Sequence, residues 1–278
     1  MNIYIYARSG HNFGMENIRR CSAIYKELAH LDPLLATADY RAASFAKSEL
    51  GVKKGLGVDI IGNLPHMMRR KDILIFDSFE PSETMREYMK DFCEILLEVG
   101  VDIPYDILDD TYFSPSEKIN EKGFFFADDD YEAEMLDLTK DCKNSQIPIL
   151  LGHYFFLGTD EKLAPYFSEI YEDEDYEKFI KGTKYLLTSC VHTALESLAS
   201  GNHPVFFARH TKPYKGELHL LEKYNIPQIS GSNLDKLVMD FDKIISNYPK
   251  TNKIEKVDIS GTVKNIEDTM KKFEEIFQ

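Results

Sequence analysis

The sequence predicts an α/β fold made of two domains, each built around a parallel β-sheet. The chain has 278 residues, more than one hydrophobic core usually organises, which suits two domains of roughly 100 to 150 residues. Short apolar runs alternate with segments of helical periodicity in both halves, the spacing typical of βαβ units. No segment approaches the ~20 uninterrupted apolar residues that cross a bilayer, so we expect no membrane span.

The first domain should span residues 1–114. Its short apolar runs, bounded by turn residues, predict strands at residues 3–7, 34–38, 58–61, 72–77 and 95–99. Apolar residues recur every three or four positions in the intervening segments, which predicts helices at residues 18–28, 42–50 and 82–92, with Ser82 as an N-cap. Residues 115–122 contain Pro115 and mixed polar residues, so we expect a linker there.

The second domain should span residues 123–260 and repeat the alternation. Strands are predicted at residues 123–127, 147–151, 185–187, 205–208 and 226–229. Helices are predicted around residues 135–138, at 191–199, 219–224 and 234–248, with two short ones in the acidic segment 158–180. Residues 261–278 should form a last helix.

The most informative stretch is residues 183–208, which predicts a strand, a turn, a helix and a second strand, with Gly201 ending the helix. A small-residue turn before a helix presents backbone N–H groups at the carboxyl end of a strand, where open α/β sheets bind phosphates. We expect Glu196 on the exposed side of the helix, able to accept hydrogen bonds from sugar hydroxyls. The alternative is an ordinary αβ unit with a surface glutamate. The residues expected to bind phosphate are Ser189, Cys190, His192 and Thr193.

Composition narrows the classes of function. The net charge of −14 argues against nucleic-acid binding, and the first strand lacks the Gly-x-Gly-x-x-Gly that a dinucleotide dehydrogenase needs. The apolar run at the start of the chain is too short for a signal peptide, and no positive charge precedes it. The four cysteines lie far apart, which indicates neither zinc nor disulfides and favours a reducing cytoplasm. We expect no cofactor.

Two segments of the first domain that can carry site residues follow predicted strands, at the edge of the sheet where its parallel strands end. The loop after residue 7 opens a helix and offers His11, Glu16 and Arg19, while Asp77 ends a strand. His11 can act as a base or be an ordinary loop residue, and Glu16 can act as a base or complement the helix dipole. Asp77 can orient a base or sugar hydroxyl, or cap the sheet. Of Arg19 and Arg20, we expect one to reach an anionic substrate and the other to be solvated.

Two charged clusters belong to the second domain. Residues 128–130 are three consecutive aspartates, which can hold Mg²⁺ but are expected to form a solvated turn. Lys212 and Lys215 lie in a basic loop and can supplement a phosphate site, although loop lysines are usually only solvated.

The motifs together resemble the GT-B nucleotide-sugar enzymes. The central unit matches their Thr-x-x-Glu-x-Leu, small residue, Gly, x-Pro pattern with one extra residue before the proline. The nearest resemblance is to the UDP-sugar hydrolases of the pseudaminic acid pathway, which are related to the peptidoglycan GlcNAc transferases. The segments that carry it are residues 12–20, 76–78, 122–130 and 187–204.

This resemblance implies two Rossmann-like domains whose parallel sheets face an interdomain cleft, with residues 261–278 packing on the first domain. It implies a nucleotide-sugar substrate, UDP-linked, with Gly14 near it and Glu196 on the ribose. Asn17 stands where the hydrolases carry their histidine base, so His11 or Glu16 would have to substitute. Aspartates 128–130 replace a glycine pair, and would repel a diphosphate by about 1 to 4 kcal/mol per close pair.

Two classes of function therefore stay open. The first is an enzyme of surface glycan biosynthesis that transfers or hydrolyses a sugar from a UDP-sugar-like donor, with domain one supplying the base. The second is a non-catalytic relative that binds a sugar or nucleotide, or a partner subunit of a glycan pathway.

Overall fold

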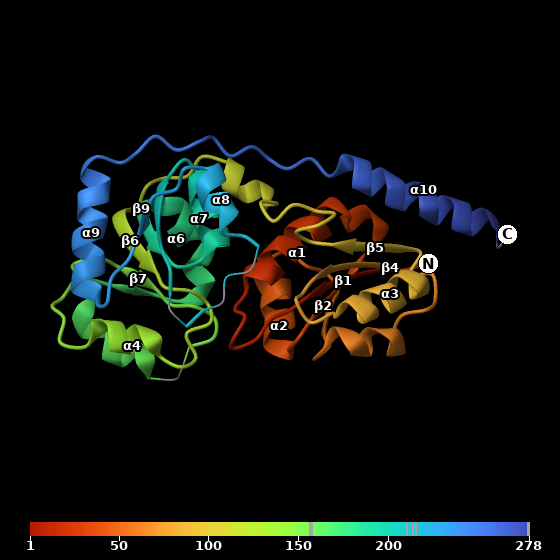
Figure 1. Ribbon diagram of the computed structural model, residues 1–278, viewed down its shortest axis with the longest axis horizontal. Coiled ribbons are helices and arrows are strands. Elements are labelled where there is room, and N and C mark those ends of the chain that lie inside the picture. The colour runs from red at the N-terminus through yellow and green to blue at the C-terminus, as the bar shows by residue number, and fades with distance from the viewer. Residues whose placement is uncertain (156–157, 210, 213, 215, 277–278) are drawn as a thin grey trace. The chain divides into compact units, whose positions relative to one another are not determined.

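The computed structural model describes residues 1–155, 158–209, 211–212, 214 and 216–276 (Figure 1). The chain forms two compact units. Unit 1 comprises Met1–Gly10, Asn17–Asp109 and Lys256–Gln278, and unit 2 comprises His11–Glu16 and Asp110–Glu255. The loop His11–Glu16 thus belongs to unit 2, although the sequence assigned it to the first domain.

Unit 1 is organised around a parallel sheet of five strands in the order β3-β2-β1-β4-β5. The central strand β1 and its neighbour β4 consist entirely of buried residues because both of their faces are covered. The edge strand β5 is only half-buried. The strands are β1 (Ile3–Ala7), β2 (Leu34–Thr37), β3 (Gly55–Gly57), β4 (Ile73–Asp77) and β5 (Ile95–Glu98).

Helices alternate with these strands as the periodicity predicted. Ser82 is confirmed as an N-cap, since its hydroxyl accepts a hydrogen bond from the backbone N–H of Met85. One strand was misplaced: the third lies at 55–57, not 58–61. Asp59 accepts hydrogen bonds from the Ile60 N–H and the Asn63 side chain, which favours a 3₁₀ turn there. The helices are α1 (Glu16–Glu27), α2 (Tyr40–Ser48), α3 (Glu83–Phe92) and α10 (Ser260–Ile276), with 3₁₀ turns η1 (Ala29–Leu31) and η2 (Ile61–His66).

Unit 2 contains a parallel sheet of six strands in the order β11-β10-β9-β6-β7-β8. Strand β6 begins at Asn120, so the predicted linker 115–122 is wrong over its last three residues. Residues 120–125 pair with β9 instead of bridging two domains. The strands are β6 (Asn120–Phe125), β7 (Ile149–Leu150), β8 (Ile170–Tyr171), β9 (Thr183–Thr188), β10 (His203–Phe207) and β11 (Gln228–Ile229).

The core of unit 2 is rich in aromatic side chains on one face of this sheet. The rings of Phe124, Phe126 and Phe207 lie with centroids 5.6 to 6.5 Å apart, and Phe241 of α9 is buried in the same cluster. The helices are α4 (Glu134–Thr139), α5 (Thr159–Leu163), α6 (Tyr176–Gly182), α7 (Val191–Ala199), α8 (His219–Lys223) and α9 (Leu234–Ser246), with 3₁₀ turns η3 (Asp110–Phe113), η4 (Ala164–Tyr166) and η5 (Asp173–Asp175).

Residues 256–276 belong to unit 1, where the segment before α10 contacts α1 and α10 itself contacts the 3₁₀ turn η1 through side chains. Lys256 pairs with Glu27, and Glu267 lies 2.7 Å from the imidazole of His30. None of the helices in the described part of the chain is long and apolar enough to cross a membrane.

Candidate functional site

The β9-α7-β10 segment has the strand, turn, helix and strand that the sequence predicted. Cys190 is the N-cap of α7, because its sulfur accepts the backbone N–H of Thr193 at 3.3 Å. Its own N–H donates to the Thr188 hydroxyl at 3.1 Å. Gly201 follows the helix with a φ of +75°, as a helix C-terminus requires.

The first turn of α7 carries backbone donors that have no acceptor. Within the described residues, the N–H groups of Val191 and His192 have no hydrogen-bond partner. The Nδ1 atom of His192 is also buried without a partner among those residues. Unpaired donors at a helix N-terminus, together with the helix dipole, favour an anion.

Glu196 is not on the exposed side of α7, as the sequence suggested, but is 1 % exposed. Tyr176 of α6 donates a hydrogen bond to its Oε2 at 2.5 Å, and the Nε2 of His192 lies 3.3 Å from its Oε1. The Tyr176 hydroxyl is also 2.7 Å from the hydroxyl of Thr193. The prediction was wrong because α6 packs on the side of α7 that the periodicity left polar. These side chains form one buried polar cluster.

A second cluster of charges surrounds Lys212. Its Nζ lies 2.5 Å from Glu16 and 3.5 Å from Asp129. Arg209 contacts Asp129 at 2.5 Å and Glu134 at 2.9 Å. Burial alone would lower the pKa of Lys212, but the carboxylates of Glu16 and Asp129 raise it well above its ordinary value. Lys212 is therefore a buried ammonium and not the solvated loop lysine that residue statistics favoured.

This cluster lies beside the start of α7. Tyr214 donates a hydrogen bond to the carbonyl of Ser189 at 2.9 Å, which ties the loop to the turn. Burial raises the pKa of the Cys190 thiol, with Glu16 raising it further and Lys212 opposing this effect. The charges of both residues thus act on the N-cap of α7.

The aspartates at positions 128–130 are buried, which contradicts the solvated turn expected from sequence. Asp128 accepts the backbone N–H of His153 at 3.2 Å, and Asp129 is paired with Arg209. Burial raises the pKa of Asp130 to about 7, against the lowering effect of Arg209. Because Asp129 is neutralised and Asp130 is partly protonated near neutral pH, their repulsion of a diphosphate is weaker than the sequence alone implies.

The loop His11–Glu16 brings three candidate residues to unit 2. The His11 ring lies 4.1 Å from the ring of Tyr131 and 5.1 Å from that of Tyr154, and the side chain is exposed. Gly14 has a φ of +71°, and a Cβ there would lie 3.2 Å from the Cβ of Asp128. Only glycine allows this approach without strain.

The other candidates lie together in unit 1. Arg20 contacts Asp77 at 2.8 Å and donates to the side-chain oxygen of Asn17 at 2.6 Å, and both side chains of the ion pair are buried. Asn17 in turn donates to the Asp77 carbonyl at 3.3 Å. Arg19 and Arg20 are both buried, so neither is the solvated arginine that the sequence suggested. Asp77 is engaged by Arg20 and has no free carboxylate to offer as a base.

Sequence reasoning missed Tyr176, Arg209 and Tyr214. Their contacts with Glu196, Asp129 and Ser189 span 20 to 80 positions of the chain, so no local motif signals them. Lys215 lies outside the described residues. Within the part that the structure describes, no group of three or more His, Cys, Asp or Glu side chains is arranged to hold a metal ion.

Solved structures share the fold of this chain. The UDP-GlcNAc 2-epimerase of Methanocaldococcus jannaschii, in complex with UDP-GlcNAc and UDP, is 9 % identical over 98 % of this chain and 99 % of its own, with a TM-score of 0.56. The glycosyltransferase of kitacinnamycin is 11 % identical over 88 % and 90 %, with a TM-score of 0.50. No protein-family profile and no curated protein sequence matches the chain. The similarity shows that the chain has the two-domain GT-B-like fold, with two parallel sheets.

Proposed function

We propose that the turn before α7 binds the phosphates of a nucleotide-activated sugar, UDP-linked, and that the protein transfers or hydrolyses that sugar in surface glycan biosynthesis. The observation that carries the proposal is the pair of unpartnered N–H groups on Val191 and His192 beside the buried ammonium of Lys212. Backbone donors and a cation converging at a strand's carboxyl end are what a phosphate needs.

In the free protein, the positively charged side chains of this site form ion pairs with carboxylates of the protein itself. Glu16 and Asp129 hold Lys212, and Asp129 also holds Arg209. A diphosphate carries the same sign of charge and can exchange with these carboxylates as the partner of Lys212. The cations are buried before the ligand arrives, so binding does not add the cost of desolvating them, whereas the displaced Glu16 carboxylate loses its partner, which opposes binding.

We assign the base to His11. The remaining candidates are occupied: Glu16 is paired with Lys212, Asp77 is paired with Arg20, and Asn17 cannot accept a proton at neutral pH. His11 is exposed and is the one side chain of this set that is not engaged in an ion pair and can accept a proton. Thr193 and Glu196 would orient the ribose, and Glu196 can do so only when the Tyr176 hydroxyl releases it.

Calorimetry with UDP and UDP-GlcNAc, followed by a turnover assay, tests the proposal. The M. jannaschii epimerase binds both compounds, which makes them the first choice of ligand. We expect both to bind, and His11→Ala to abolish turnover while leaving UDP affinity within about twofold, because the side chain acts on the sugar and not on the phosphates. Tyr131→Phe is a matched control, since it keeps the ring beside His11. If neither UDP nor UDP-GlcNAc binds, the proposal is contradicted.

A second function is favoured by the same ion pairs. Because two of the three carboxylate or histidine bases are neutralised, the protein can be a relative that binds a sugar nucleotide without turnover, or a partner subunit of a glycan pathway. Binding of UDP-GlcNAc that releases neither UDP nor an epimer would support this reading.

A further inference from the structure

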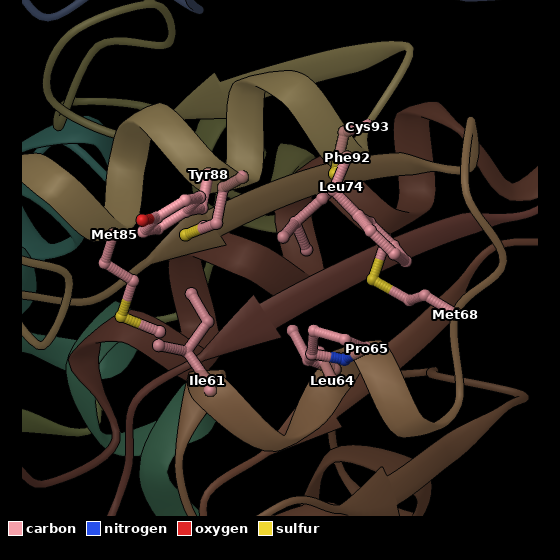
Figure 2. A pocket seen from close by; sticks show the side chains of 11 residues that line it. Ile61, Leu64, Pro65, Met68, Leu74, Met85, Tyr88, Phe92 and Cys93 are labelled. Carbon is pink, nitrogen blue, oxygen red and sulfur yellow. The ribbon is translucent and has the colours of Figure 1, made fainter.

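Unit 1 contains a cavity of about 250 Å³ that the proposed nucleotide site does not use. It lies between the 3₁₀ turn η2, helix α3 and strand β4 (Figure 2). The side chains that line it are apolar or aromatic, with no charged group among them: Ile61, Gly62, Leu64, Pro65, Met68, Leu74, Met85, Tyr88, Met89, Phe92 and Cys93.

Three methionines give this cavity an adaptable wall. Met85 and Met68 lie at opposite ends of it in Figure 2, and Leu74 of β4 forms part of the wall between them. Methionine has three rotatable bonds and a polarisable thioether, so such walls adjust to ligands of varied shape. The lining is therefore suited to a flexible apolar group and offers no partner to a charged one.

The helix above the cavity is incompletely packed. A helix that covers a sheet normally buries its apolar stripe. None of the residues of α3 is fully buried, although Met85, Met89 and Phe92 face the core cluster of unit 1, and Tyr88 is 72 % exposed. The apolar face of α3 thus opens to solvent through Tyr88, which gives a ligand a way in.

We propose that this cavity binds an uncharged alkyl or aryl chain of about ten carbon atoms. A dry apolar cavity of about 150 Å³ is enough for benzene, and scaling by volume gives roughly ten carbons for this one. The chain can be a free apolar molecule or the tail of an amphiphile whose polar head stays in solvent. The inference is independent of nucleotide binding, because every lining residue belongs to unit 1.

Straight-chain alcohols from butanol to decanol test this with the full-length protein. With ¹³C-labelled methionine methyl groups, we expect the NMR signals of Met68, Met85 and Met89 to shift on titration. Met135 and Met239 of unit 2 provide internal controls and should not move. Affinity should rise about fourfold per added methylene and level off when the cavity is full. Equal shifts at all methionines, or affinity that does not depend on chain length, would overturn the proposal.

A filling variant provides the second test. A Cβ at Gly62 would lie 3.4 Å from the methyl group of Met85, so Gly62→Leu should occupy the cavity without a backbone clash and reduce octanol affinity at least tenfold. Gly261→Leu is the matched control, because a Cβ there meets nothing within 4 Å. Octyl glucoside, which carries a polar head on the same alkyl chain as octanol, distinguishes an amphiphile tail from a free apolar molecule as the ligand. If it binds as tightly as octanol, the cavity accepts the tail of an amphiphile; if it binds more weakly, the cavity takes a free molecule. Unchanged octanol affinity in a folded Gly62→Leu protein would refute the site.

Discussion

The ammonium of Lys212 lies 2.5 Å from the carboxylate of Glu16, a residue 196 positions earlier in the chain. Both side chains are at least nine-tenths buried, and the Asp129 carboxylate lies 3.5 Å from the same nitrogen. This pair attaches the loop after β1 to the loop after β10, which Tyr214 in turn connects to the turn before α7. Any anion that binds there must compete with Glu16 for Lys212.

Removing the lysine should therefore destabilise the protein. Lys212→Met leaves Glu16 and Asp129 buried with less compensation, and we expect a loss of about 3 to 5 kcal/mol in the free energy of unfolding. Urea denaturation measures it, with Lys243→Met, at an exposed pair with Asp240, as the control. Adding Glu16→Gln should restore part of the loss. Additive effects of the two substitutions would show that the residues do not interact.

Tyr176→Phe tests the buried cluster around Glu196. The carboxylate loses its hydrogen-bond donor, and we expect a loss of about 1 to 3 kcal/mol in unfolding free energy. Tyr248→Phe removes a hydrogen bond from a tyrosine hydroxyl to a neutral carbonyl in the same unit and should cost less. Because the Tyr176 hydroxyl competes with a ribose for Glu196, UDP affinity should stay equal or rise in Tyr176→Phe. A tenfold weaker affinity would exclude that role for Glu196.

Asp130→Asn should change the pH dependence of stability. The pKa of Asp130 is about 7 in the folded protein and about 3.8 when unfolded, so the folded protein binds more protons between these values. Its stability contribution is therefore complete below pH 4 and is lost as the pH rises through 7.

Relative to the wild type, Asp130→Asn should thus gain stability from pH 4 to 8, up to about 4 kcal/mol for a shift of roughly three pKa units. Thermal unfolding across this range measures the difference. Asp137→Asn, at an exposed position of α4, the helix that follows Asp130, is the control. A difference that does not vary with pH would mean that Asp130 is ionised throughout.

The fold was predictable because it rests on local patterns. The apolar runs at β1, β4 and β9 and the turn before α7 were all recognised from spacing alone. The misplaced third strand shows the limit of this reasoning, since pairing with β2 selected Gly55–Gly57 over the more apolar residues that follow. The pattern of apolar residues indicates which segments are buried. Which of two neighbouring segments forms the strand depends on hydrogen bonding to the adjacent strand of the sheet.

The candidate site was predictable only in part. Sequence placed Ser189, Cys190, His192 and Thr193 at the start of a helix, which the structure shows. It could not show that Tyr176 covers Glu196, or that Arg209 and Lys212 compensate Asp129, because these contacts join residues from separate elements. From sequence alone, each of these charged side chains was therefore expected to be solvated or to repel a ligand. In the folded protein they form ion pairs with one another.

The affinity of Val191→Pro for UDP tests the central claim most directly. Val191 is the first residue of α7, where proline fits the helix and removes only a backbone N–H, and Cys190 already has the extended φ of −104° and ψ of 118° that a following proline requires. Val191→Ala shortens the side chain but keeps the N–H. We predict that calorimetry will show UDP binding about 10 to 100 times weaker in Val191→Pro than in Val191→Ala, the loss of one charged hydrogen bond. Equal affinities in two folded variants would contradict phosphate binding at this helix.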